Sequence, residues 1–106
     1  MREPRFDANG YPDHYTLLAI QAWDRADRRG LMELMMYCCK AWWNRETLWE
    51  RTDRTYSIST GGWSGNESII SALMNNQVFW AMCWVSSRRG GHYEFEIPEG
   101  KEAADE

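Results

Sequence analysis

The stretch Thr55-Tyr-Ser-Ile-Ser-Thr-Gly-Gly-Trp-Ser-Gly-Asn-Glu67 decides how this chain folds. Tyr56 and Ile58 alternate with serines, which predicts a strand with one buried face. The two glycines favour a tight turn. Ser64 and Glu67 then form the Ser-x-x-Glu pattern of a capping box, which predicts that a helix begins there. We therefore expect a strand, a glycine-rich corner and a helix in succession.

The helix after the corner is predicted to be long. Its apolar residues recur at helical spacing and are Ile69, Ile70, Leu73, Met74, Val78, Ala81, Met82 and Val85. Asn75-Asn76-Gln77 interrupts this stripe and can kink or split the helix, but we predict one continuous element that ends at Gly90-Gly91. A last strand follows at residues 92–98, where apolar residues alternate with glutamates.

Two helices are predicted before the central strand. Asp13 is a suitable N-cap for the first, which runs to about residue 26, and Gly30 is its expected stop signal. The second runs from Leu31 to about Asn44. Its apolar residues form an inner stripe (Leu31, Leu34, Met35, Cys38, Trp42) and a second stripe beside it (Met32, Met36, Cys39, Trp43). A helix this apolar needs cover on more than one side, and a partner chain is one source of that cover.

Together these elements predict an α+β fold. It has two N-terminal helices, a small two- or three-stranded sheet and a long third helix between the last two strands. Residues 47–51 alternate weakly and are the expected first strand, joined to the next by a turn at Thr52-Asp53. We expect residues 1–98 to form a single domain and residues 99–106 to form an acidic flexible tail.

Charge and cysteine content limit the class of protein. The net charge is −4, and four acids in the last eight residues account for most of it. A near-neutral body argues against generic nucleic-acid binding, which needs a basic surface. Three cysteines that include the pair Cys38-Cys39 make a poor disulfide framework and favour a reducing cytoplasm.

Other classes are also disfavoured. The first residues lack the apolar run of a signal peptide, and no apolar run is long enough for a membrane span, so a cytoplasmic protein is expected. No His or Cys stands at zinc-ligand spacing, and we expect neither a metal nor a cofactor.

Two segments resemble a known group of proteins. They are Ile58-Ser-Thr-Gly-Gly-Trp-Ser-Gly-Asn-Glu67, and Phe79-Trp80 followed by Cys83-Trp-Val-Ser-Ser-Arg-Arg-Gly-Gly-His-Tyr-Glu-Phe-Glu96. This pattern resembles small uncharacterised proteins encoded by actinobacterial phages, over about residues 56–98. The resemblance implies an accessory protein that acts inside the host cell, and no assigned activity comes with it.

The glycine-rich corner is the first candidate site. Ser64, Gly65 and Asn66 offer backbone N–H groups at a helix N-terminus, which can hold an anion or can belong to a plain capping box. The segment also approaches the Gly-x-Ser-x-Gly nucleophile elbow, but asparagine stands where the last glycine belongs.

A second candidate is the basic cluster of Arg88, Arg89 and His92. It either complements the dipole of the long helix or binds a phosphate or carboxylate. If the helix folds back at Asn75-Asn76, this cluster meets Ser64 and forms a composite site.

Aromatic residues supply the third candidate. Seven tryptophans exceed what so small a core needs, and tryptophan often anchors protein contacts. The candidate partner-binding residues are Trp42, Trp43, Trp63, Trp80 and Trp84, with core packing as the alternative.

These features predict a non-enzymatic interaction protein that uses its Trp- and Met-rich helical surface. Its partner is a host or phage protein, or a second copy in a homo-oligomer such as a homodimer. The alternative is a nucleic-acid-associated regulator that uses Arg25, Arg28 and Arg29 together with the Arg88, Arg89 and His92 cluster. An enzyme is less favoured, because no acid–base pair or nucleophile–base pair stands out.

Overall fold

The computed structural model describes residues 3–99, which form five helices and a four-stranded sheet. In chain order the elements are α1 (His14–Gln21), α2 (Arg28–Ala41), α3 (Arg45–Leu48), β1 (Trp49–Thr52), β2 (Thr55–Ser59), α4 (Ser64–Asn75), α5 (Gln77–Cys83), β3 (Trp84–Arg88) and β4 (His92–Glu96). The predicted α+β class and the two N-terminal helices are confirmed. The predicted acidic tail, apart from Glu99, lies outside the described residues.

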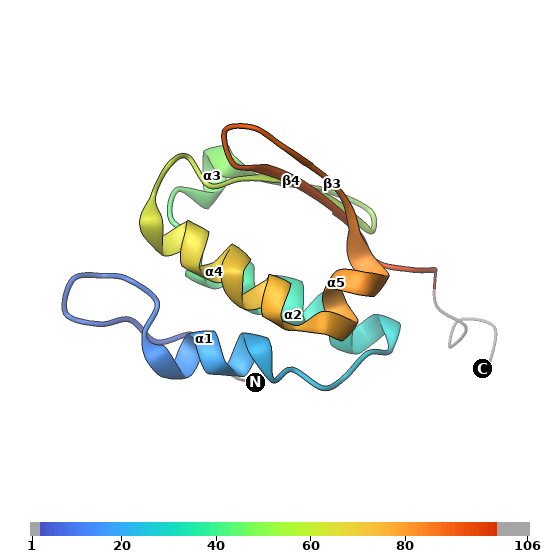
Figure 1. Ribbon diagram of the computed structural model, residues 1–106, viewed down its shortest axis with the longest axis horizontal. Coiled ribbons are helices and arrows are strands. Elements are labelled where there is room, and N and C mark those ends of the chain that lie inside the picture. Colours follow the sequence, from blue (N-terminus) through green and yellow to red (C-terminus); the bar gives the residue numbers. More distant parts are fainter. Residues whose placement is uncertain (1–2, 100–106) are drawn as a thin grey trace.

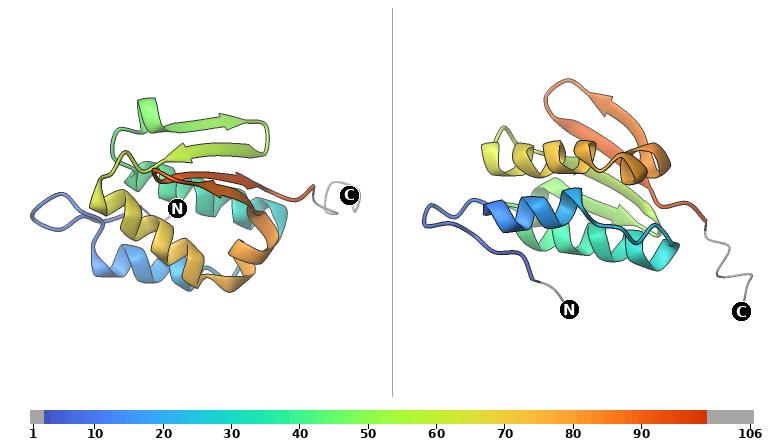
Figure 2. Two further views of the ribbon diagram at one scale, coloured as in Figure 1. Left: turned by 45° about the horizontal axis from the view of Figure 1, so that its top comes forward. Right: turned by 60° about the horizontal axis from the view of Figure 1, so that its bottom comes forward.

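The sheet is antiparallel throughout, with the strand order β1-β2-β4-β3. Helices α1, α2, α4 and α5 all lie on one side of it (Figure 1). α1 packs against α4, so the helical layer is itself two deep in places (Figure 2). One face of the sheet is therefore covered, whereas the other displays the polar side chains of β2 and β4 to solvent.

The core lies between the covered face and the helices. Tyr56 and Ile58 of β2 pair with Phe95 and Tyr93 of β4, and all but the half-buried Tyr93 are fully enclosed. The predicted alternation of both strands is thus confirmed. The inner stripe of α2 belongs to the same core cluster as these strand residues. All five members of the stripe are buried: Leu31, Leu34, Met35, Cys38 and Trp42.

The prediction of one long helix after the corner is wrong. The helix breaks at Asn76 into α4 and α5, and residues 84–88 form β3 instead of continuing the helix. The buried Asn76 side chain accepts from the Phe79 N–H (3.1 Å) and donates to the carbonyls of Ile20 (2.9 Å) and Trp23 (3.1 Å). It satisfies polar backbone groups at the start of α5 and the end of α1, which are costly to bury unpaired. The extra strand gives a sheet of four strands, not the two or three predicted.

The break also changes which side chains are buried. In α5, Phe79 and Cys83 take the inner positions. Val78, Met82 and Val85, which the continuous stripe placed in the core, are about half exposed. An apolar surface therefore lies over α5 and the start of β3, where the sequence predicted a buried face.

The first helix boundary differs as well. α1 ends at Gln21, and Gly30 lies in the first turn of α2 rather than after a helix. Its N–H donates to the Asp27 carboxylate (3.1 Å), which caps α2. A Cβ at Gly30 would clash with Arg25, so the close approach of the preceding loop requires glycine.

Replacing Asn76 by alanine is expected to lower the free energy of unfolding by about 2–4 kcal/mol. The change removes the cap of α5 and two hydrogen bonds from the Asn76 amide to carbonyls at the end of α1. Urea denaturation followed by circular dichroism measures the loss. The matched control is Asn75→Ala at the exposed neighbouring position, which should change stability by less than about 0.5 kcal/mol. Equal losses in the two variants would show that Asn76 does not hold the break.

Candidate functional site

The glycine-rich corner joins β2 to α4 through residues 60–63. Gly61 and Gly62 have positive φ angles of 64° and 76°, which glycine adopts at little cost. Trp63 is the N-cap of α4, so the helix begins at Ser64, one residue earlier than the predicted capping box requires. The capping-box prediction is therefore wrong. The Trp63 ring lies over Gly65, where any Cβ would clash with it, and this packing fixes the start of the helix.

Most of the corner's polar groups already serve the fold. The buried Asn66 side chain accepts from the Trp43 N–H (2.9 Å) and donates to the carbonyls of Trp43 (3.2 Å) and Thr60 (3.2 Å). Gly65 is buried too, and only Ser64 of the three predicted anion-binding residues is exposed. The Asn66 side chain thus links the end of α2 to the corner, and these three hydrogen bonds leave little of its hydrogen-bonding potential for a ligand.

The predicted basic cluster lies on β3, β4 and their turn, not in the last turn of a helix. Arg88 forms an ion pair with Glu94 (3.3 Å) on the open face of the sheet, and Arg89 is exposed in the turn. The turn contacts the glycine-rich corner through a bond from the Thr60 N–H to the Gly91 carbonyl (3.0 Å). The two predicted clusters are therefore neighbours, but this contact is a backbone bond and not a shared site of side chains.

His92 lies among hydroxyl groups on the open face. Its Nε2 is 3.0 Å from Ser57 Oγ and its Nδ1 is 2.8 Å from Ser59 Oγ. A serine bonded to histidine can be part of a nucleophilic pair, but a triad needs a carboxylate on the opposite ring nitrogen. Glu94 approaches Nε2, the nitrogen opposite the one that contacts Ser59, but at 3.6 Å it is too distant for the hydrogen bond that orients a catalytic histidine. The geometry fits a cross-strand network that supports the β2–β4 pairing better than it fits acyl transfer.

The five candidate tryptophans do not form one surface. Trp42 is a core residue, and its indole N–H donates to the Ser59 carbonyl (3.1 Å). Trp43 is 48% exposed and stacks on Trp63, with ring centroids 5.7 Å apart. Trp63 also contacts Tyr11 (5.1 Å).

Trp80 and Trp84 form a second, separate pair. They stack with centroids 6.1 Å apart, at the end of the molecule that holds α5, whereas the Trp43–Trp63 pair lies at the start of α4 (Figure 1). Trp84 is 45% exposed and follows directly after α5, whose exposed apolar residues include Val78 and Met82. We call this region the α5 surface; its members are Met74, Val78, Met82, Trp84 and Val85.

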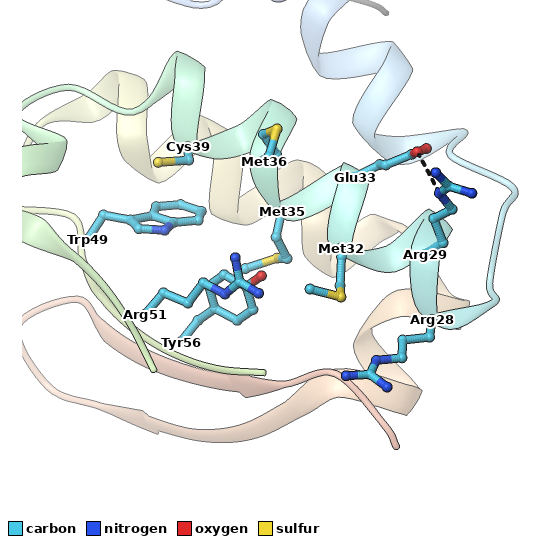
Figure 3. A pocket seen from close by; sticks show the side chains of 10 residues that line it. All are labelled: Arg28, Arg29, Met32, Glu33, Met35, Met36, Cys39, Trp49, Arg51 and Tyr56. Carbon is cyan, nitrogen blue, oxygen red and sulfur yellow. Dashed lines mark ion pairs between the residues drawn. The ribbon is translucent and has the colours of Figure 1, made fainter. Parts of the chain in front are cut away.

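A groove of about 560 Å³ opens between α2 and the β1–β2 edge of the sheet (Figure 3). Its apolar lining consists of Met32, Met35, Met36, Cys39, Trp49 and Tyr56. Its charged residues are Arg28, Arg29, Glu33 and Arg51. We call it the α2–β1 groove. The second stripe of α2, which the sequence left without intramolecular cover, supplies one wall.

The charge around the groove is mainly positive. Arg29 pairs with Glu33 at 3.8 Å, and the Arg51 guanidinium lies 5.7 Å from the Tyr56 ring centroid. Arg28 has no ion pair with any other residue in the described range 3–99. Three arginines against one glutamate favour a ligand that carries negative charge next to an apolar part.

The thiol in the groove is neutral at physiological pH. Burial raises the pKa of Cys39, and this effect outweighs the opposing charge of Arg45. Burial also raises the pKa of Tyr56, with Arg51 acting against it. Cys39 and Tyr56 therefore line the groove as uncharged groups.

The sequence contained only part of this site. Helical spacing predicted the second stripe of α2, from which Met32, Met36 and Cys39 line the groove, but the opposite wall comes from Trp49 and Tyr56 of the sheet. The alternation of Trp49 with Glu50 was the available signal for the inward direction of Trp49. Nothing in one sequence showed that this edge of the sheet lies beside α2.

Other classes of site find no support among residues 3–99. Within that range no helix combines the length and apolar character that crossing a membrane requires, and no group of three or more His, Cys, Asp or Glu side chains is placed to hold a metal ion.

Cys39 is expected to react with iodoacetamide at pH 7.4 several-fold more slowly than glutathione does. The thiolate is the reactive form, and the raised pKa lowers its fraction near neutral pH, so the rate should keep rising above pH 9. Mass spectrometry of the labelled protein measures the rate. Cys39→Ser should remain unlabelled, because Cys38 and Cys83 are buried and their pKa values are raised, that of Cys83 to about 12. Labelling as fast as that of glutathione would refute an apolar environment for Cys39.

Comparison with known protein families, with curated proteins and with solved structures finds no match to this chain. The resemblance to small phage proteins therefore stays a prediction.

Proposed function

We propose that this protein is a non-enzymatic interaction protein whose α2–β1 groove binds a partner protein. The observation that carries the proposal is a concave, methionine-rich groove whose charged residues are mainly arginines. The resemblance to phage proteins further suggests that the partner is a factor of the host cell. The matching segment of that partner is apolar and bears carboxylates.

The energetic argument rests on the exposed apolar side chains. Met36 is 48% exposed, although it lies in the middle of α2. Covering a methionine fully is worth roughly 1.5–3 kcal/mol, and methionine adapts its shape to different partners. Met36 has about half of that gain still available, and Met32 and Trp49, which are already partly buried, add less, so a partner that covers all three gains on the order of 2 kcal/mol from apolar contact.

The arginines add selectivity to this apolar contact. Charges at the edge of an interface mainly raise the association rate and reject partners of the wrong sign. A segment with Asp or Glu beside its apolar residues pairs with Arg28 and Arg51, whereas a basic segment is repelled. The same charges make the association weaken as the salt concentration rises.

A nucleic-acid partner has less support. The N-terminal end of α2, with Arg28 and Arg29, and the β3–β4 turn, with Arg89, lie at opposite ends of the molecule (Figure 1). Arg25 pairs with Glu33 at 3.0 Å and Arg88 pairs with Glu94, so part of the positive charge is already neutralised.

The α5 surface and the Trp43–Trp63 pair are also partly exposed, and we propose them as secondary contacts with the partner protein.

The substitution Met36→Gln is expected to weaken partner binding about tenfold, or ~1.4 kcal/mol, because it replaces an apolar contact by a polar side chain of similar size. The matched control is Met74→Gln on the α5 surface, since Met74 is 50% exposed and Met36 is 48% exposed. Proteins captured from an actinobacterial lysate by the wild type and by Met74→Gln should be lost with Met36→Gln. Thermal unfolding of both variants checks that each is folded.

The opposite result would assign the function elsewhere. Capture that survives Met36→Gln and is lost with Met74→Gln would place binding on the α5 surface. Light scattering on the wild type and on both variants, at micromolar concentration, reports self-association separately. A dimer that only Met36→Gln dissociates would make the partner a second copy of this chain.

A further inference from the structure

We infer that the partner segment binds as an extended strand along the free edge of β1, which adds a fifth strand to the sheet. Every second side chain of that segment then enters the α2–β1 groove. This inference rests on the proposed function of the groove and specifies how the groove recognises its ligand.

The backbone of β2 shows which groups of β1 face outward. The Arg54 carbonyl accepts from the Ile97 N–H (2.8 Å), and the Thr60 N–H donates to the Gly91 carbonyl (3.0 Å). Even-numbered residues of β2 therefore turn their polar backbone groups toward β4, and odd-numbered residues turn theirs toward β1.

The register of β1 completes the assignment. Ser57 and Thr55 stand opposite Glu50 and Thr52, so these two residues of β1 are bonded to β2. The backbone groups of Trp49 and Arg51 consequently point to the free edge. They are two residues apart, which is the spacing at which an antiparallel neighbour pairs.

Some of these outward groups are already used. The Trp49 N–H donates to the Arg45 carbonyl at the end of α3. The Trp49 carbonyl and both polar backbone groups of Arg51 have no partner within residues 3–99. An unpaired edge of this kind is a template for an added strand.

The side chains on this edge point into the groove. Trp49 and Arg51 stand opposite Ile58 and Tyr56, the inner-face residues of β2, and both line the groove beside α2 (Figure 3). A strand added next to β1 follows the same alternation, so every second side chain faces Met32 and Met36.

The dimensions set the length of the segment. The groove follows α2 from Arg28 to Cys39, which is about 16 Å of helix at 1.5 Å per residue. A strand covers that distance with about five residues, of which two or three face the groove. The expected pattern is two apolar groove-facing residues and an acidic one near Arg28. The intervening residues lie beside Glu50 on the open face and are uncharged or basic.

The charges favour a different protein over a second copy. Two-fold pairing of β1 with β1 would place the same surface of each copy against the other. The arginines of one groove would then face those of its partner, and like charges on opposed strands destabilise the pairing. A segment that carries carboxylates meets no such repulsion.

Selection of a random twelve-residue peptide library on the wild-type protein tests the inference. Enriched peptides should show apolar residues at every second position, with Asp or Glu beside them. The decisive pair of variants is Arg51→Pro and Arg51→Gln. Both lose the guanidinium, but only proline lacks the outward N–H, and proline at this position leaves the β1–β2 bonds in place. An enriched peptide should bind Arg51→Pro at least tenfold more weakly than Arg51→Gln.

A second measurement guards against misfolding of the proline variant. The enriched peptide is resynthesised with N-methyl groups on alternate residues, in both phases. One phase should lose binding to the wild type at least tenfold, whereas the other phase should bind nearly unchanged.

The outcomes separate the two proposals. Peptides with apolar residues three and four apart, or equal binding by both N-methylated phases, overturn strand addition while leaving the groove as the binding site. Failure to enrich any peptide, or peptides that bind Met36→Gln as well as wild type, overturns both. A dimer that Arg51→Pro dissociates overturns the assignment to a different protein and makes the added strand that of a second copy.

Discussion

The buried amide of Asn76 is the interaction on which the arrangement of this fold depends. It bonds the first turn of α5 and two carbonyls at the end of α1 at once. After this break the second helix, α5, runs only to Cys83, and residues 84–88 form β3. β3 covers the far edge of β4, and β1 is left as the edge of the sheet that borders α2. A polar residue in an otherwise apolar stripe therefore separates α4 from α5 and fixes both to the end of α1.

A second buried amide performs a similar task at the other end of the helical layer. Asn66 joins the end of α2 to the glycine-rich corner through three hydrogen bonds. Buried amides with all their bonds satisfied are specific, because any shift of the elements leaves polar groups unpaired. Asn66 and Asn76 together hold α2, α4 and α1 in fixed relation to the sheet. The walls of the α2–β1 groove are consequently held by the fold, which lowers the entropic cost of binding.

The distribution of apolar side chains connects this architecture to the proposed function. The inner stripe of α2 fills the core, whereas the second stripe is only partly covered, and Met36 on it is half exposed. The edge strand β1, with its unpaired backbone groups, lies directly beside this second stripe of α2. Natural proteins usually protect the edge strands of their sheets from unwanted pairing with charged side chains, and Glu50 and Arg51 are charged residues of this kind on β1. Charges on both faces of the edge restrict pairing to a segment of complementary charge, which is consistent with selective binding rather than aggregation.

The sequence by itself determined the local elements and their buried faces. Period-two alternation identified β2 and β4, helical spacing identified the inner stripe of α2, and Asp13 marked the start of α1, where it accepts from the Thr16 N–H at 2.8 Å. These signals are local, because each depends on residues within one or two turns or on one strand. Only the tertiary structure decided the break at Asn76, since its bonding partners Ile20 and Trp23 lie 56 and 53 residues away. The groove was decided in the same way: its walls come from α2, β1 and β2, and apolar periodicity does not encode which surplus face lies beside which strand edge.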